Sequence, residues 1–357
     1  MRNEVVPKTR RRMKKLPVDE IICGDATSIL QGIPEDSIDF VITSPPYFQQ
    51  RKYAGGEIGG ERYVESYIDA LLDVFHEVVR VLRHEGSIVF NIGDKYQNGS
   101  LLLVPFRFAL KAMEKEKVSI INNVTWVKTN PTPRQFHRRL VSSTEPFFHF
   151  VKSRAYNYNI DAFQNDLDNI DLRKSPATLY KKYGSSKIGE SYRKLIESSD
   201  LTEEQKLRAL ADLDRVITEV KSGTVSEFRM KIKGIHSPAF GGQSGGRASQ
   251  MEKNGYTIIR MYGEKLKRDV IISAVEAPRG YRHPAVYPQS IVEQFINLLT
   301  SKNSIVLDPF IGSGTTALAA KNLGRHYIGI DINPEYVSMS KERLENLQVS
   351  GRDNIEK

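Results

Sequence analysis

The sequence predicts a doubly wound α/β fold that carries a separate, loop-rich and helical module between its two halves. Short apolar runs suited to buried parallel strands alternate with segments of helical period before residue 154, and again after residue 280. Between these positions the alternation stops, and much of the chain is polar or rich in Gly, Ser and Gln. With 357 residues, of which 39% are apolar, the chain can form one large core and a second module.

In the first half, the helix expected at 64–82 has the clearest period. Its apolar residues fall on one face: Val64, Ile68, Leu71, Leu72, Phe75, Val78, Val79 and Leu82. Arg83 and His84 follow at the C-terminal end, where positive charge is favourable, and Gly86 ends the helix. We predict strands at 18–23, 38–43, 87–92, 118–127 and 147–151, with further helices at 26–31 and 105–113.

The second half resumes after residue 280 and is predicted as helix 289–300, strand 304–308, glycine loop 310–314, helix 315–323, strand 326–331 and helix 334–347. Inside the module, residues 202–220 form a good helical pattern, with a capping box at Thr202 and Gln205 and Gly223 beyond its end. Residues 236–255 are rich in Gly, Ser and Gln, so we expect a loop there.

Composition indicates a soluble cytoplasmic protein with a polyanionic partner. The mean hydropathy is −0.41, and no apolar run is as long as a membrane span. The net charge of +9 is concentrated in residues 1–17 and 151–283, while the remainder is mildly acidic. Two basic segments on an acidic core favour nucleic acid, although a solvated tail and an ordinary basic surface are the alternative. The single cysteine, Cys23, excludes a disulfide framework, and we expect it in the core. No histidine pair has metal-ligand spacing, so no metal is expected.

The stretch IDFVITSPPY, residues 38–47, reads as a buried strand that runs into Ser44, Pro45, Pro46 and Tyr47. The prolines end the strand, because neither can donate to a ladder. A hydroxyl, free carbonyls and an aromatic ring then stand at the carboxyl end of a strand, where open α/β sheets bind ligands. A strand followed by a proline turn is the simpler alternative. The glycine-bearing segment after Tyr47 is a candidate lid.

The stretch DPFIGSGTT, residues 308–316, lies between a strand and a helix and predicts a nucleotide-type binding loop. Gly312 and Gly314 allow a tight turn and close approach of a ligand, and the following helix directs its positive end toward an anion. Asp331 ends the next strand, where an acidic residue can bind ribose hydroxyls. The third glycine of G-x-G-x-x-G is missing, since residue 317 is Ala. This argues against a dinucleotide and favours a smaller anion, such as an amino-acid carboxylate.

TSPPY followed much later by DPFIGSGTT resembles the β-group of S-adenosylmethionine-dependent amino-DNA methyltransferases. Four further segments resemble that family: GDAT (24–27), TWVKTNPTP (125–133), HPAVYPQSIVEQFI (283–296) and GIDINPEY (329–336). The resemblance implies a circularly permuted Rossmann-like methyltransferase sheet, S-adenosyl-L-methionine as cofactor and double-stranded DNA as substrate. It divides the chain into a basic arm (1–17), a catalytic half (18–153), a target-recognition region (154–280) and a cofactor-binding half (281–357).

The resemblance also assigns site residues. Catalysis falls to Ser44, Pro45, Pro46 and Tyr47. Cofactor binding falls to Asp25, His283, Asp308, Phe310, Gly312, Ser313, Gly314, Thr315 and Asp331. DNA contact falls to Arg51, Lys52, Trp126, Lys128, Arg134, Arg138 and Arg139. Trp126 could instead pack in the core, and the arginines could form a solvated face. Tyr281 and His283 could contact the cofactor or merely pack against the helix. Glu145 could orient the arginine cluster.

The chemistry implied is methyl transfer to an exocyclic amine, whose lone pair is delocalised into the base. Ser44 Oγ and the Pro45 carbonyl can accept both N–H hydrogens, and Tyr47 can stack on the flipped base. Within the family, serine at position 44 is typical of cytosine-N4 enzymes, whereas Asp or Asn is typical of adenine-N6 enzymes. We therefore expect a cytosine-N4 enzyme of restriction-modification type, from a bacterium, archaeon or phage.

Several alternatives stay open at this point. They are an adenine-N6 enzyme, a catalytically silent DNA-binding protein, and a methyltransferase for a small molecule or protein, which the basic segments disfavour. The missing third glycine disfavours a nicotinamide-dependent oxidoreductase. The sequence leaves a homodimer, the recognition sequence and the presence of a partner nuclease undecided.

Overall fold

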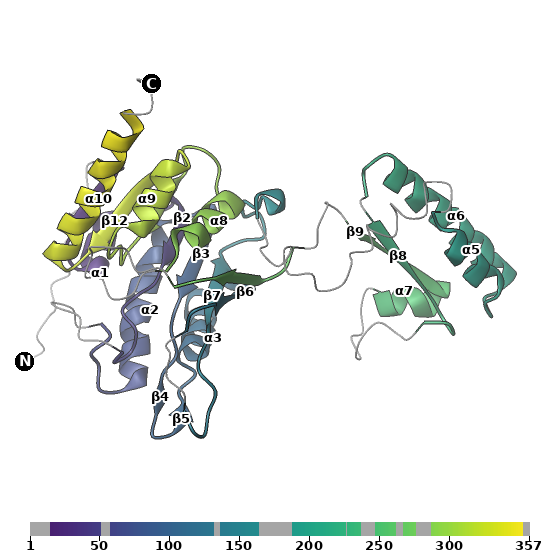
Figure 1. The fold of residues 1–357 in the computed structure, drawn as a ribbon, viewed down its shortest axis with the longest axis horizontal. Coiled ribbons are helices and arrows are strands. Elements are labelled where there is room, and N and C mark those ends of the chain that lie inside the picture. Colours follow the sequence, from purple (N-terminus) through teal and green to yellow (C-terminus); the bar gives the residue numbers. More distant parts are fainter. Residues whose placement is uncertain are drawn as a thin grey trace, which may run out of the picture. The chain divides into compact units, whose positions relative to one another are not determined.

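The computed structural model describes residues 15–50, 58–131, 136–163, 188–225, 227–236, 247–261, 267–275 and 287–352 (Figure 1). The chain divides into two compact units. The first consists of Met1–Leu167 and Lys267–Lys357, and the second of Asp168–Leu266. The predicted module, 154–280, is wider than the second unit, because strand β10 (Val270–Ser273) pairs with the large sheet of the first unit. Most of the predicted basic arm lies outside the described residues.

The described part of the first unit forms around an eight-stranded, mostly parallel sheet (Figure 1). Its strands, in spatial order, are β1 (Glu20–Cys23), β12 (His326–Asp331), β11 (Ile305–Asp308), β2 (Ile38–Thr43), β3 (Leu82–Asn91), β7 (Thr144–Val151), β6 (Ser119–Lys128) and β10. Only β7 runs antiparallel to its neighbours within this sheet. Two strands from the end of the chain, β11 and β12, therefore lie between β1 and β2 from its beginning, which is the order of a permuted sheet.

Helices cover both faces of the sheet, so the predicted doubly wound α/β fold is confirmed. On one face pack α1 (Ala26–Gly32), α2 (Val64–Val81) and α3 (Val104–Glu116). On the other face pack α8 (Gln289–Leu299), α9 (Thr315–Asn322) and α10 (Pro334–Arg352). Each face has its own apolar core, because successive strand residues point to opposite sides of the sheet.

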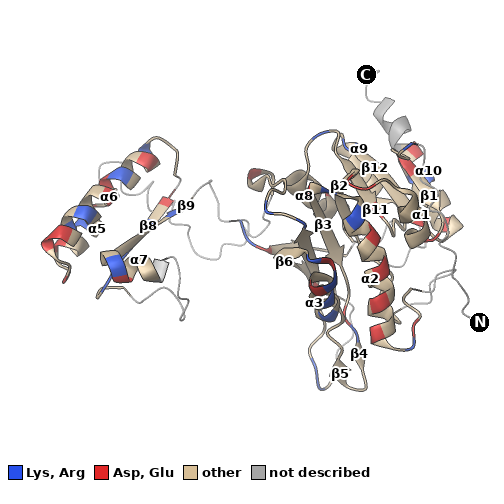
Figure 2. Cartoon of the chain, turned by 180° about the vertical axis from the view of Figure 1, so that it is seen from behind, with Lys and Arg blue, Asp and Glu red and all other residues tan. Residues whose placement is uncertain are grey.

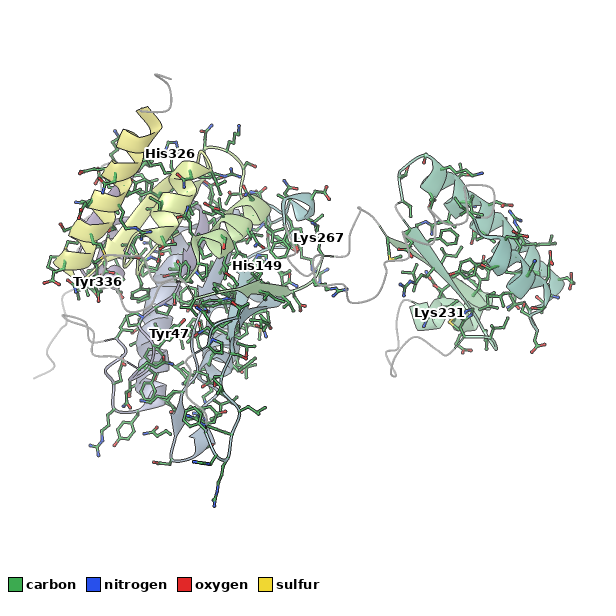
Figure 3. The ribbon with its side chains drawn as sticks, viewed as in Figure 1. Tyr47, His149, Lys231, Lys267, His326 and Tyr336 are labelled. Carbon is green, nitrogen blue, oxygen red and sulfur yellow. The ribbon has the colours of Figure 1, made fainter. Side chains whose placement is uncertain are left out.

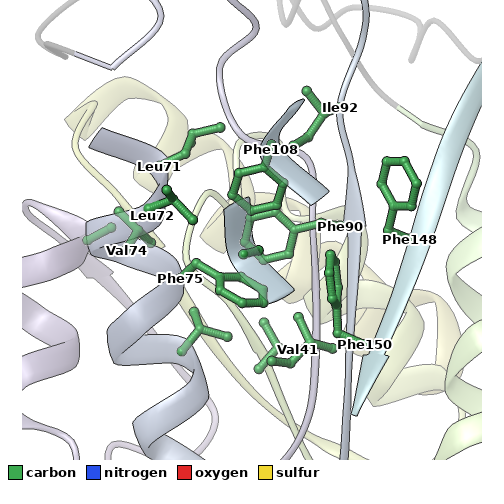
Figure 4. Packing of buried hydrophobic residues seen from close by; sticks show 14 of the residues in the cluster. Val41, Leu71, Leu72, Val74, Phe75, Phe90, Ile92, Phe108, Phe148 and Phe150 are labelled. Carbon is green, nitrogen blue, oxygen red and sulfur yellow. The ribbon is translucent and has the colours of Figure 1, made fainter. Parts of the chain in front are cut away.

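The core beneath α2 and α3 centres on phenylalanines (Figure 4). The ring of Phe75 lies edge-on to those of Phe90, Phe108 and Phe150, at centroid distances of 5.3, 5.5 and 5.1 Å. Such pairs contribute about 0.5–1.5 kcal/mol each beyond the burial of their area. The helix that brings Phe75 to the sheet follows the period expected from the sequence, since its apolar face is the buried one.

The outer faces of α2 and α3 are joined by ion pairs one helical turn apart. Glu65 pairs with Arg107 at 2.7 Å, Asp69 with Lys111 at 3.3 Å and Asp73 with Lys115 at 3.5 Å. These side chains are exposed, and each such pair contributes little, about 0–1 kcal/mol. Their repeat fixes how the two helices lie along each other, and Figure 2 shows the acidic bands of α2.

The second unit consists of a two-stranded ribbon packed on helices. Its elements are α5 (Glu190–Glu197), α6 (Glu203–Lys221), β8 (Glu227–Ile232), α7 (Arg247–Asn254) and β9 (Tyr256–Met261). Alternate residues of β8, namely Phe228, Met230 and Ile232, are buried against the helices. The predicted capping box is present, since Gln205 N donates to Thr202 Oγ1 and Thr202 N donates to Gln205 Oε1. Cations on α5 and α6 alternate with the carboxylates that pair with them (Figure 2).

Some elements were not expected from the sequence. Helix α7 occupies part of the segment 236–255, which we predicted as loop. The hairpin β4 (Tyr96–Gln97) and β5 (Ser100–Leu101), and the short helix η1 (Ile160–Ala162), were also not predicted. Cys23 was wrongly placed in the core: it is exposed, because it ends the edge strand β1. No described helix is long and apolar enough to cross a membrane.

Candidate active site at the carboxyl edge of the sheet

Polar side chains from several strands lie together at one edge of the sheet, the edge formed by the carboxyl ends of its parallel strands. The parallel strands β2, β3, β6 and β11 end at this edge, and the antiparallel strand β7 begins there. The edge therefore brings together Ser44, which follows β2, Asn91 and Lys128, which end β3 and β6, and Glu145, near the start of β7. These residues are as much as 101 positions apart in the chain and meet only because of the strand order.

The two predicted motifs meet at the same edge. Strands β2 and β11 are neighbours, with Phe40 opposite Val306 and Val41 opposite Leu307. At their ends, Thr43 Oγ1 donates a buried hydrogen bond of 2.5 Å to Asp308 Oδ1, across 265 positions of sequence. TSPPY and DPFIGSGTT therefore lie side by side on one sheet, in keeping with the circularly permuted sheet that the resemblance implies.

Asp308 organises this junction. Besides Thr43, its carboxylate accepts hydrogen bonds from the Phe310 amide (3.0 Å), the Tyr287 hydroxyl (3.1 Å) and the Thr316 hydroxyl (2.6 Å). The predicted cofactor residue Asp308 thus has both oxygen atoms occupied by protein donors, and it positions the glycine loop. Burial disfavours its charged form and raises the pKa of Asp308 from the ordinary 3.8 to about 6, against the opposing effect of the four donors.

The glycine loop after Asp308 has a shape that other residues would not permit. Gly312 and Gly314 have φ of +52° and +83°. A Cβ atom on Gly314 would lie 2.6 Å from Ser340 Cβ of α10, so the loop lies directly against this helix. Arg343 of α10 donates to the Ser313 carbonyl at 2.5 Å. Helix α9 then begins at Thr315, with the positive end of its dipole beside the loop.

Asp331 lies across the loop from Gly312. Its Oδ2 accepts the Gly312 amide and its Oδ1 the Asn333 amide, both at 2.9 Å. Each carboxylate oxygen can accept further bonds, since it has more than one lone pair. Burial raises the pKa of Asp331, and the two amides oppose that effect. Next to it, the Ile332 side chain is 42% exposed.

Asp25 lies beside this strand end, because Gly24 N donates to the Asp331 carbonyl at 2.9 Å. Its Oδ1 caps helix α1 by accepting the Ser28 amide (2.8 Å) and the Ser28 hydroxyl (2.7 Å). Asp25 is exposed, and the cap uses only one of its two oxygen atoms.

A network of hydroxyl groups follows β2. Ser44 Oγ donates toward Tyr47 Oη (3.1 Å) or Asn91 Oδ1 (3.3 Å). Tyr47 Oη donates toward Asn91 Oδ1 (2.7 Å) or Glu145 Oε2 (3.1 Å). Asn91 Nδ2 donates to the Pro146 carbonyl at 3.1 Å, which can only accept, so the amide oxygen must face the two hydroxyls. Figure 3 shows Tyr47 within the first unit.

The network ends in an ion pair between Lys128 and Glu145, both mostly buried. The Lys128 ammonium also lies 4.7 Å from the centroid of the Trp126 ring. Two residues predicted to contact DNA are therefore engaged within the protein. Trp126 is only 3% exposed, and its Nε1 donates to the Ser273 carbonyl at 3.1 Å, which matches the packing alternative. Glu145 binds Lys128 and Tyr47, whereas the sequence suggested that it orients arginines.

The proline carbonyls of the motif differ in their partners. Pro46 O accepts the Tyr67 hydroxyl at 2.8 Å. No hydrogen bond reaches the Pro45 carbonyl from any residue that the structure describes. The Tyr47 ring is held against the backbone at Gly93, where a Cβ atom would lie 2.4 Å from Tyr47 Cε2. Position 93 therefore accepts no side chain while the ring keeps this place.

The other predicted residues are distributed as follows. Arg51, Lys52, Arg134, Tyr281 and His283 lie outside the described residues. Phe310 is partly buried and packs on the core of the α1–α3 face. Arg138 is exposed, and the guanidinium of Arg139 lies 3.8 Å from the Tyr96 ring centroid and 3.7 Å from that of Phe136.

Sequence reasoning missed Asn91, Tyr287 and Ile332. The signal for Asn91 was a polar residue that ends an apolar strand, which is unusual for a buried position. Tyr287 lay inside a quoted segment, but its bond to Asp308 depends on packing. Ile332 follows the expected ribose-binding aspartate directly, but its exposure could be recognised only from the structure.

The chain is similar in sequence to known methyltransferases. A family model for N6/N4 methyltransferases, described as DNA methylase, matches residues 38–342. The chain is 28% identical over 378 residues to the type II methyltransferase M.SfiI of Streptomyces fimbriatus, with 88% of each protein covered. It is 24% identical over 355 residues to M.SmaI of Serratia marcescens, with 91% of this chain and 90% of that protein covered.

Among solved structures, the fold resembles that of PvuII DNA methyltransferase (cytosine-N4-specific). The TM-score is 0.55 at 18% identity, with 90% of this chain and 84% of that chain covered. At this identity the likeness bears on the fold, and it supports the arrangement of strands and helices described above.

The raised pKa of Asp308 predicts a pH dependence of stability. Between pH 4 and 6 the folded protein keeps a proton on Asp308 that the unfolded chain has released, so this group's contribution to the free energy of unfolding falls as pH rises. The slope is at most about 1.4 kcal/mol per pH unit. We would measure urea unfolding of the wild type and of Asp308→Asn across this range. The free energy of unfolding of the wild type should fall relative to that of Asp308→Asn as the pH rises toward 6. Asp73→Asn, at an exposed α2 site, is the control, and parallel curves for wild type and Asp308→Asn would contradict the assignment.

Proposed function

The chain belongs to the DNA methylase family of N6/N4 methyltransferases, and we propose that it transfers a methyl group from S-adenosyl-L-methionine to the exocyclic N4 of cytosine. The target base is flipped out of double-stranded DNA within a specific sequence. The observation that supports the proposal is the set of acceptors around the Ser44 and Tyr47 hydroxyls, namely Asn91 Oδ1 and Glu145 Oε2.

In the network of Ser44, Tyr47, Asn91 and Glu145, each hydroxyl has an acceptor within the protein. The amide oxygen of Asn91 and the carboxylate of Glu145 only accept, so Tyr47 is the donor in its contacts with them. Ser44 Oγ can donate to Tyr47 Oη or Asn91 Oδ1. The lone pairs of Ser44 Oγ are left to accept an N–H of the target amine. The Pro45 carbonyl is the second acceptor, since no described residue donates to it.

Two acceptors suit the reaction, because they favour a tetrahedral nitrogen whose lone pair is free to attack. The proton that the amine loses can pass from Ser44 Oγ through Tyr47 Oη to the Glu145 carboxylate. Each step joins oxygen atoms 3.1 Å apart. Lys128 lies beside Glu145 and holds its carboxylate in place through their ion pair.

The residues on the glycine-loop side of the candidate site fit the cofactor. Asp331 keeps free lone pairs for two ribose hydroxyls, and Ile332 offers an exposed apolar surface to the adenine ring. The glycine loop and the amino end of α9 suit the carboxylate of the methionine part. Bound there, S-adenosyl-L-methionine supplies an electrophilic methyl group. Asp308 holds the loop at the level of Ser44 through its bond to Thr43.

Serine at position 44 supports cytosine as the target over adenine. It is a neutral acceptor of the type seen in cytosine-N4 enzymes of the family, whereas Asp or Asn is typical of adenine-N6 enzymes. The test is to grow a plasmid in cells that express the chain, digest its DNA and identify the modified nucleoside. We expect N4-methylcytosine; N6-methyladenine would overturn the assignment of the base. Unmodified DNA would favour a silent DNA-binding protein. Sequencing of the modified positions gives the recognition sequence.

Ser44→Ala should reduce methyl transfer about 100-fold or more, because the amine loses its positioned acceptor. Cofactor and DNA binding should be unchanged, as measured by calorimetry and by gel shift. Ser37→Ala is a matched control just before the opposite end of the same strand, where the hydroxyl donates to the Pro34 carbonyl. Undiminished turnover of Ser44→Ala would refute the role assigned to Ser44.

Asp331→Ala should weaken binding of S-adenosyl-L-methionine about 10-fold or more, because hydrogen bonds to a charged carboxylate are lost. DNA affinity measured without cofactor should change little. Asp73→Ala, at an exposed α2 position, is the control for loss of an acidic side chain. Equal cofactor affinity of wild type and Asp331→Ala in calorimetry would show that the ribose assignment is wrong.

A further inference from the structure

We propose that Leu140 is the side chain that enters the DNA duplex and fills the gap left by the flipped base. The inference rests on the proposed function and adds a second contact with DNA, outside the pocket that receives the base. It starts from exposure: Leu140 is 87% exposed, the highest value among the large hydrophobic side chains that the structure describes.

Exposure alone would carry little, since single exposed apolar residues are common on protein surfaces. The position of Leu140 is the second observation. It lies in the connection from β6 to β7, at whose two ends Lys128 and Glu145 form the ion pair of the candidate site. The connection is closed at its base, where Lys128 N donates to the Ser143 carbonyl at 2.8 Å. Leu140 therefore lies in a loop whose base adjoins the candidate site.

The residue before Leu140 is anchored as well. The Arg139 guanidinium lies against the rings of Tyr96 and Phe136, at 3.8 and 3.7 Å from their centroids. Tyr96 follows Lys95, whose Nζ donates to the Gln49 carbonyl at 2.9 Å, two positions beyond Tyr47. These contacts tie the loop to the segment that carries the proposed base-binding motif. Leu140 thus lies in a loop that these contacts tie to the candidate site, and it remains 87% exposed.

The charge around Leu140 fits a DNA backbone. Arg138 and Arg139 precede it directly, and neither forms an ion pair with a residue in the described ranges. Two such cations can contact phosphates on either side of a deformed step. An apolar tip beside arginines is a combination that proteins use to open a base step from the minor groove.

The energetics explain why a leucine would serve. Flipping a base costs a few kcal/mol of lost stacking and pairing, and it leaves an apolar gap between the neighbouring bases. A side chain of this size can occupy the gap and bury its own exposed surface against the adjacent base faces. The flipped state is then favoured, while the pocket that holds the base is unchanged.

The test compares two duplexes that carry the recognition sequence. In one the target cytosine is paired with guanine; in the other it faces an abasic site, so that no pairing opposes flipping. Leu140→Ala should lower turnover on the paired duplex about 10-fold or more, and much less on the abasic duplex. Leu140→Met, which keeps the apolar bulk, should retain most of the turnover on both. Leu110→Ala is the matched control, at a 57% exposed leucine of α3, and should act as wild type.

Each outcome has a distinct meaning. Transfer by the wild type together with undiminished transfer by Leu140→Ala on the paired duplex would overturn the role of Leu140 alone. An equal loss on both duplexes would also overturn it, because the defect would then not concern flipping. Absence of transfer by the wild type on both duplexes would overturn the proposed function, and this inference with it. Thermal unfolding of the variants shows whether each is folded, which an exposed position should allow.

Discussion

The hydrogen bond between Thr43 and Asp308 is the contact on which the rest of the site depends. It joins the last residues of two neighbouring strands, so it sets the glycine loop and the Ser-Pro-Pro-Tyr segment at one level of the sheet. Transfer between two bound groups requires their placement to within a fraction of an ångström. A buried carboxylate with four donors meets that need, because moving any donor leaves a buried acceptor unsatisfied.

Around Ser44 the protein has arranged its polar groups so that each satisfies another. Asn91 serves two hydroxyls with its oxygen and a carbonyl with its nitrogen, and Glu145 serves Tyr47 and Lys128. In the reaction that we propose, this arrangement is in place before the base binds, so little reorganisation is expected. The ion pair with Glu145 likewise explains why Lys128, which the sequence suggests for DNA contact, is engaged within the protein.

Local patterns in the sequence were enough to predict most strands and helices of the first unit. Residue period identified α2, and motifs at strand ends pointed to the two strands, β2 and β11, that meet at the candidate site. The partners of Asn91 and Glu145 could not be predicted, because they depend on β7 being antiparallel to β3 and β6. Local sequence patterns do not indicate the direction of a strand within a sheet. In the second unit the alternation in β8, Glu-Phe-Arg-Met-Lys-Ile, was present but lay in a polar segment where it carried little weight. Burial of Trp126 likewise depends on β10, whose pairing joins distant residues.

The strand order has a consequence for synthesis of the chain on the ribosome. Strands β1 and β2 emerge early, yet the two strands that belong between them, β11 and β12, emerge only after residue 304. Until then the nascent sheet carries bare edges, which are templates for wrong pairing with other chains. The long separation between partners also raises the contact order and slows folding. We therefore expect cells to depend on chaperones, which shield those edges, when they produce this protein quickly.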